Sequence, residues 1–64
     1  MKQKELKNLA KKIAKYELII QKGEDKKAIA DAEAQIMKLS GCVDKIEDMV
    51  IIDELVQEYI EELS

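Results

Sequence analysis

The chain contains no proline and only two glycines, Gly23 and Gly41. Each glycine follows a segment with helical apolar spacing and comes soon after a lysine, which is a usual signal for the end of a helix. Glycine at such an end readily adopts the left-handed backbone conformation that other residues adopt only at a cost. The two glycines therefore divide the 64 residues into three predicted helices, and both are expected to have positive φ.

The first predicted helix covers residues 2–22, and its large apolar residues recur at intervals of three and four. This spacing places them on one helical face, as in a bundle or coiled coil. The predicted core-facing residues are Leu6, Leu9, Ile13, Tyr16 and Ile20.

Two further helices are predicted over residues 25–40 and 44–63. The second is rich in alanine, which favours the helix and lets neighbouring helices approach closely. The third is expected to begin with a capping box, because Asp44 is followed three residues later by Glu47. Their predicted core-facing residues are Ile29, Ala32, Ile36 and Leu39, and then Ile46, Met49, Ile52, Val56, Tyr59, Ile60 and Leu63.

Short turns at the glycines make sequential helices antiparallel neighbours. The sequence therefore predicts an all-α fold, an up-down-up antiparallel three-helix bundle that forms a single domain over residues 1–64. A core of this size is marginal, and chains of this length often gain stability from a staple or a partner. Cys42 is the only cysteine, so no disulfide can form within the chain, and a partner or second copy is the expected source of stability.

Charge changes sign along the chain. Residues 1–22 carry seven lysines and two glutamates, whereas residues 43–64 carry one lysine and eight acidic residues. A solvated surface is the plain interpretation of such runs, and a face that meets an opposite charge is the sharper one. Five lysines of the first helix form an arc opposite its apolar face and are possible phosphate-facing residues: Lys4, Lys7, Lys11, Lys15 and Lys22.

An enzymatic function is not expected, and no cofactor or metal is predicted. The chain has no histidine for acid–base catalysis or zinc binding, and no glycine-rich phosphate loop. Cys42 is expected to be a small buried hydrophobe rather than a reactive thiol. Asp53 falls within the apolar arc of the third helix, where we expect a boundary position in contact with water or a lysine.

No targeting segment is visible, and the longest apolar run covers only residues 49–52. A lone thiol and the absence of an export signal favour the cytoplasm and argue against a membrane protein.

The chain has more large apolar residues than its core requires. A three-helix bundle needs about fourteen to sixteen of them, and this chain has twenty-four. An exposed surplus marks an interaction surface, and a homodimer through the third helix is expected to cover it, with a different protein as the alternative partner. The predicted interface consists of Val50, Ile51, Leu55, Leu18 and Met37.

The sequence therefore predicts a small protein–protein interaction or regulatory module that acts through apolar and charged helix faces. The alternative is a nucleic-acid-binding protein that uses the lysine arc. Against it stand the net charge of −3 and the absence of arginine for base readout.

Overall fold

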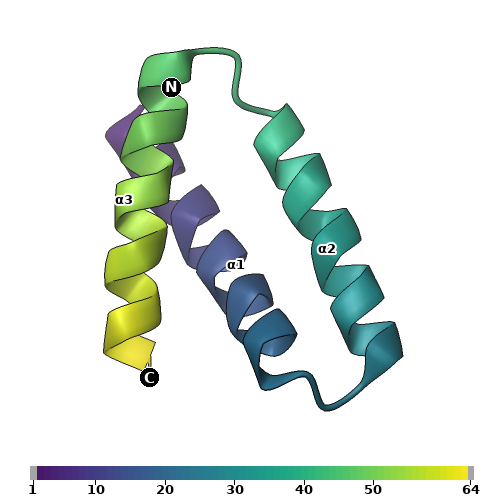
Figure 1. Ribbon diagram of the computed structural model, residues 1–64. Coiled ribbons are helices and arrows are strands. Elements are labelled where there is room, and N and C mark those ends of the chain that lie inside the picture. The colour runs from purple at the N-terminus through teal and green to yellow at the C-terminus, as the bar shows by residue number, and fades with distance from the viewer. Residues whose placement is uncertain (1, 64) are drawn as a thin grey trace.

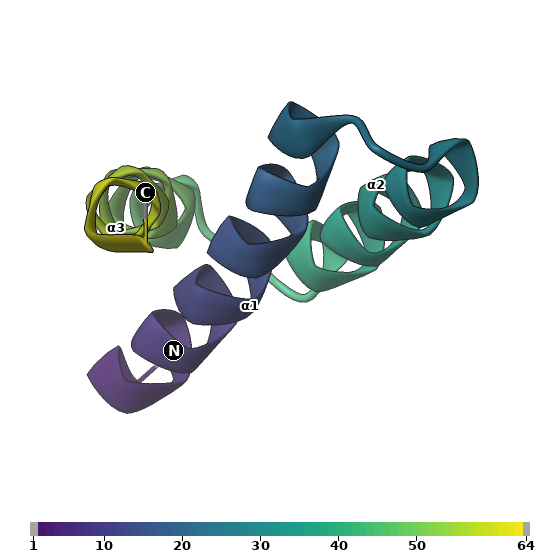
Figure 2. The same cartoon turned by 90° about the horizontal axis from the view of Figure 1, so that it is seen from below.

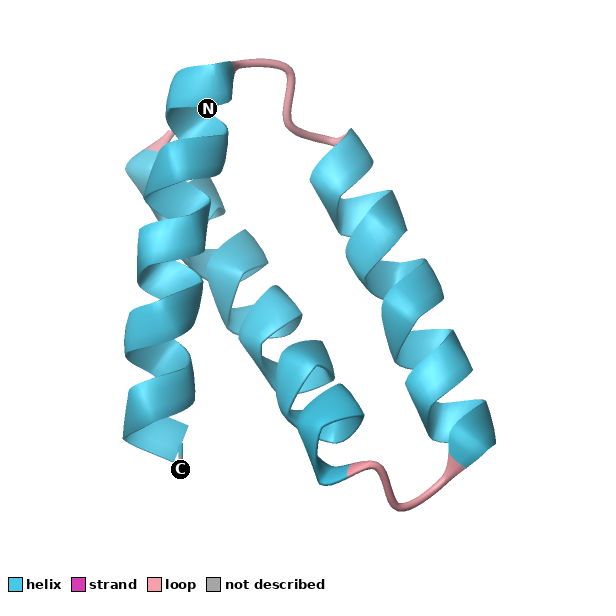
Figure 3. Cartoon of the chain, in the orientation of Figure 1, coloured by secondary structure: helices cyan, strands magenta, loops and turns pink. Residues whose placement is uncertain are grey.

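The computed structural model describes residues 2–63, which form three α-helices: α1 (Gln3–Lys22), α2 (Lys26–Gly41) and α3 (Ile46–Leu63). The helices alternate in direction along the chain (Figure 1), and two short loops join them (Figure 3). The predicted up-down-up three-helix bundle is confirmed, and each helix boundary lies within two residues of the predicted one.

Gly23 ends α1 in the predicted manner. Its backbone is left-handed, with φ 62° and ψ 25°, and its N–H donates a hydrogen bond of 3.2 Å to the carbonyl of Ile19. This bond satisfies a carbonyl that the end of the helix leaves without a partner. After the loop, the Asp25 carboxylate accepts a hydrogen bond of 3.0 Å from the Lys27 N–H and caps α2.

The prediction of a left-handed Gly41 is wrong. Gly41 is the last residue of α2, and Gly23 is the one described residue with positive φ. The Cys42 N–H donates to the carbonyl of Leu39 at 3.2 Å, and the Val43 N–H donates to that of Ser40 at 3.1 Å. Each of these bonds spans three residues instead of the four of an α-helix. They satisfy the terminal carbonyls without a left-handed residue.

The predicted start of α3 is also corrected. The helix begins at Ile46, and the Lys45 carbonyl accepts the first helical bond from the Met49 N–H at 3.2 Å. Lys45 therefore occupies the N-cap position, and Asp44 lies in the preceding loop. The predicted capping box between Asp44 and Glu47 does not form the start of this helix.

α1 is the central helix. It packs against both α2 and α3, whereas α2 and α3 barely meet. Figure 2 shows α1 between the other two helices. Three closely packed helices with aligned axes would be about 15 Å wide in both directions across the bundle. The Cα atoms of this chain extend over 34 × 24 × 15 Å, so the bundle is wider in one of these directions. The bundle is therefore open along the side where α2 and α3 face each other across α1.

The core lies mainly between α1 and α3, and two alanines that the sequence analysis did not assign to it are at its centre. Ala10 and Ala14 are both 0% exposed, and they belong to one buried cluster with Ile52 and Val56 of α3. Small side chains on α1 let the two helix backbones approach closely. The predicted core residues Leu6 and Ile13 complete this cluster, and Ala32 of α2 is also buried.

Candidate functional site

A groove of about 360 Å³ lies between α2 and α3 on the open side of the bundle. Its floor includes Ile13 and Glu17 of α1, which are one helical turn apart, and Ile36 and Ser40 of α2 form one wall. The remaining lining residues are Gln21 of α1 and Met49, Ile52, Asp53, Val56, Gln57 and Ile60 of α3.

The groove has one long wall, which α3 forms. The α3 residues in its wall follow one another at intervals of three, one, three, one and three, which is the spacing of a single helical face. Met49 and Ile60 are eleven residues apart, so this wall is about 16 Å long at 1.5 Å per residue. An elongated occupant, such as three turns of another helix, fits this form better than a compact small molecule does.

Two exposed apolar side chains lie beside the α3 wall, near the start of the helix. Ile46 is 83% exposed and Val50 is 52% exposed. Ile46 lies seven residues before Asp53, and Val50 lies seven residues before Gln57, so both share the helical stripe of these groove residues. The predicted placement of Ile46 in the core is therefore wrong, because no helix covers this end of α3. Ile46 and Val50 therefore form an exposed apolar surface next to the polar edge of the groove.

The charged residues of the groove are all acidic. Glu17 is half-buried on the floor, and Asp53 is exposed on the α3 wall. Neither carboxylate has a hydrogen-bond or ion-pair partner among residues 2–63, and no lysine lines the groove. The expectation that Asp53 is a boundary residue in contact with water is confirmed. Glu17 was not among the predicted site residues, although Glu17 also interrupts an apolar arc, that of α1.

The predicted interface residues do not form one patch. Val50 and Ile51 are consecutive, so they project about 100° apart on opposite flanks of α3, and Ile51 is 41% exposed. Leu55 follows Ile51 by one turn, is half-buried and packs against the core. Leu18 is half-buried on α1, and Met37 is 76% exposed on α2, beyond the face that packs on α1. Only Val50 lies on the groove stripe of α3.

All five lysines of the predicted arc are exposed, and the middle of the arc lies beside α3. The Lys11 Nζ is 5.8 Å from the centroid of the Tyr59 ring. Lys11 and Lys15 line a hollow of about 230 Å³ together with Tyr59, Glu62 and Leu63 of α3. Part of the arc therefore contacts the acidic helix of the same chain, whereas Lys4, Lys7 and Lys22 lie outside this hollow.

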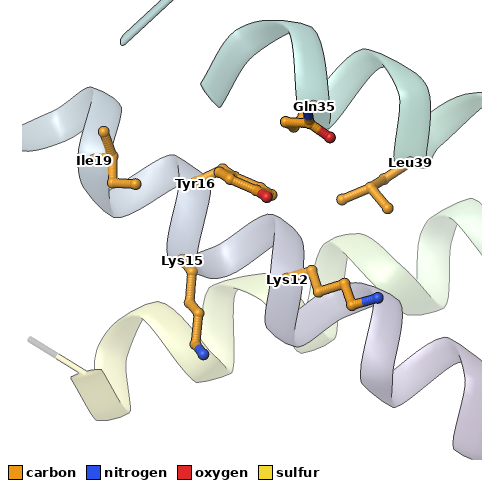
Figure 4. Close-up of a pocket in the computed structure, with 6 residues that line it drawn as sticks. All are labelled: Lys12, Lys15, Tyr16, Ile19, Gln35 and Leu39. Carbon is orange, nitrogen blue, oxygen red and sulfur yellow. The ribbon is translucent and has the colours of Figure 1, made fainter. Parts of the chain in front are cut away.

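A second hollow, of about 410 Å³, lies where α1 meets α2 and contains six side chains (Figure 4). The Tyr16 ring points toward Gln35 and Leu39 of α2, whereas the Lys15 chain extends away from α2 (Figure 4). Because Tyr16 and Leu39 join the two helices, this hollow belongs to the packing of α1 on α2. Its exposed apolar residue, Ile19, is 38% exposed, well below Ile46 and Val50 beside the groove.

Cys42 is exposed, so the prediction of a buried thiol is wrong. Its thiol donates a hydrogen bond of 3.6 Å to the carbonyl of Lys38, one turn earlier at the end of α2. The residue lies in the loop after α2, where the next residue, Val43, packs against the core instead.

No group of three or more potential metal ligands comes together in the described part of the chain. Within residues 2–63, none of the helices combines the length and apolar character that a membrane span requires.

Comparisons with family models, curated proteins and solved structures give no match to this chain.

Proposed function

We propose that this protein is a protein–protein interaction module, and that the groove between α2 and α3 receives a helix of its partner. The observation that carries the proposal is the exposure of Ile46 and Val50, at 83% and 52%, on the same helical stripe of α3 as the groove residues Asp53 and Gln57. A partner helix lying along α3 would cover these side chains and remove their apolar surface from water. Recognition of an amphipathic helix in an apolar groove is a common mode of binding.

The open arrangement of the bundle supports the same function. α2 and α3 both pack on α1 but barely meet each other, so a fourth helix between them would complete a four-helix arrangement. The 16 Å wall offers this helix about three turns of contact.

A second copy of this chain is the alternative to a different protein as the partner at the groove. On α3, the surface between Val50 and Ile51 is acidic, because Glu47, Glu54 and Glu58 recur along it at intervals of seven and four. This surface therefore disfavours a symmetric contact between two copies of α3. A twofold α3–α3 contact would bring these acidic residues close to their own copies. We therefore favour a different protein as the partner, and the oligomeric state in solution separates the two.

Nucleic acid is the second candidate partner, and the exposure of all five lysines of the arc supports it. The contact of Lys11 with Tyr59 supports instead a role of the arc in packing α1 beside α3. A gel shift at low salt with mixed DNA and RNA tests this candidate, and replacing Lys4, Lys7 and Lys22 with Gln should abolish any shift.

Photocrosslinking in cells tests the proposed groove. Gln57 lines the groove, whereas the adjacent Glu58 projects outward, and both are exposed. A benzoylphenylalanine at position 57 should crosslink to a discrete protein in the cells from which the chain comes, and the same group at position 58 should not. Equal crosslinking from both positions, or none from position 57, would contradict a docking role for the groove.

A further inference from the structure

The charges of the groove restrict what can occupy it. Glu17 is half-buried on the floor of the groove, Asp53 lies on its α3 wall, and neither has a partner among the described residues. A helix that covers the groove removes both carboxylates from water. An ionised carboxylate that loses water without gaining a cation or hydrogen bonds is strongly disfavoured. An occupant with only apolar side chains would therefore bind poorly.

We infer that the groove selects an amphipathic helix whose apolar face is flanked by lysine or arginine side chains, which would pair with Glu17 and Asp53. This inference rests on the proposed function and adds the chemical class of the partner. The charge of the lining supports it, because both ionisable groups are acidic and no lysine of the described residues lines the groove. Acidic helices would meet like charges and be rejected, which gives the groove specificity as well as affinity.

The same charges argue against a second copy as the occupant. A groove-to-groove contact would bring Glu17 and Asp53 of one copy toward the same residues of the other. Lys11 and Lys15, in the middle of the α1 lysine arc, lie beside α3 and away from the groove, and no lysine of the described residues lines it. A separate basic helix satisfies the carboxylates directly.

Two model peptides test the inference. Both are eighteen residues long with the same leucine face, and the flanking positions are lysine in one and glutamate in the other. Binding is followed by NMR shifts of the labelled full chain. The lysine peptide should shift groove residues such as Ile36, Asp53 and Gln57, and it should bind at least about tenfold more tightly than the glutamate peptide.

Matched variants separate recognition of the groove from general attraction to an acidic protein. E17Q/D53N removes both groove carboxylates, whereas E54Q/E58Q removes two exposed carboxylates on the outer surface of α3. E17Q/D53N should weaken the lysine peptide by roughly fivefold, and E54Q/E58Q should change its affinity by less than about twofold. Circular dichroism melts of both variants check that each is folded, and the single D53N variant, at an exposed site, keeps the test available if E17Q unfolds the chain.

Three results would overturn the inference: equal affinity for the two peptides, equal weakening by the two double variants, or no binding of either peptide at millimolar concentration. None of these results changes the expected difference in crosslinking between positions 57 and 58. The docking role of the groove can therefore survive the failure of this inference.

Discussion

The ammonium group of Lys11 on α1 lies 5.8 Å from the centre of the Tyr59 ring on α3. This distance is within the range of a cation–π contact. The contact joins the lysine-rich first helix, whose segment 1–22 has a net charge of +5, to the acidic third, whose segment 43–64 has −7. The fold therefore places the two oppositely charged parts of the sequence beside each other. Part of the charge gradient along the sequence has a structural explanation within the chain.

A double-mutant cycle measures this contact. Lys11→Gln and Tyr59→Leu should show a coupling free energy of about 0.5 kcal/mol in urea unfolding, because the cation is exposed. Lys7→Gln is the matched control, since Lys7 is an exposed lysine one turn earlier on α1. A coupling with Tyr59 that is as large for Lys7 as for Lys11 would contradict the assigned contact.

Replacement of the two glycines by alanine should affect the free energy of unfolding differently. Gly23→Ala should lower the free energy of unfolding by about 1 kcal/mol, because a side chain disfavours its φ of 62°. Gly41→Ala should leave stability unchanged or raise it by up to about 1 kcal/mol, because Gly41 is helical and a Cβ there meets nothing within 4 Å. Thermal melts decide, and equal destabilisation by both changes would contradict the two helix ends described above.

Larger side chains should disrupt the close approach of α1 to α3. Ala14→Leu adds volume at a position that is 0% exposed, and overpacking of this kind costs about 1–3 kcal/mol. Ala34→Leu is the control, because Ala34 is exposed on α2 and should change stability by less than about 0.5 kcal/mol. Chemical unfolding of both variants tests this, and a fully stable Ala14→Leu would place the helix contact elsewhere.

The existence and order of the helices could be predicted from apolar spacing, because a 3.6-residue period is a local property of the sequence. Gly23 also marked its helix end correctly. Gly41 also marked the end of α2, but its predicted left-handed conformation was wrong, because a helix can end through three-residue hydrogen bonds without a left-handed residue and the sequence does not distinguish the two endings.

The groove could not be predicted in the same way. Spacing shows that Val50 and Ile51 flank the main apolar face of α3, but it does not show which flank a neighbouring helix covers. Likewise, Ala10 and Ala14 carry a weak apolar signal, and only the position of α3 reveals that they are at the centre of the core. A carboxylate within an apolar arc was the available signal for the groove. Asp53 and Glu17 both carry this signal, but only Asp53 was singled out from the sequence.

Light scattering of the purified chain should give the monomer mass of 7.3 kDa throughout the micromolar range, because carboxylates separate Val50 from Ile51 on α3. If the mass doubles with concentration, the chain forms a dimer. The variant pair Ile51→Glu and Leu55→Glu would then locate the contact, and loss of the dimer in that pair would place it on the flank away from the groove.

The most direct test of the docking role compares two double variants that each remove two exposed apolar side chains. I46Q/V50Q alters the groove stripe of α3, whereas I19Q/I51Q alters exposed positions outside it. Both carry the photocrosslinker at position 57, and the yield of the partner adduct is measured per folded protein. The proposed function predicts that I46Q/V50Q lowers this yield about tenfold and that I19Q/I51Q leaves it near that of the parent chain. An unchanged yield in I46Q/V50Q, or an equal loss in both variants, would contradict the assignment of the groove as the binding site.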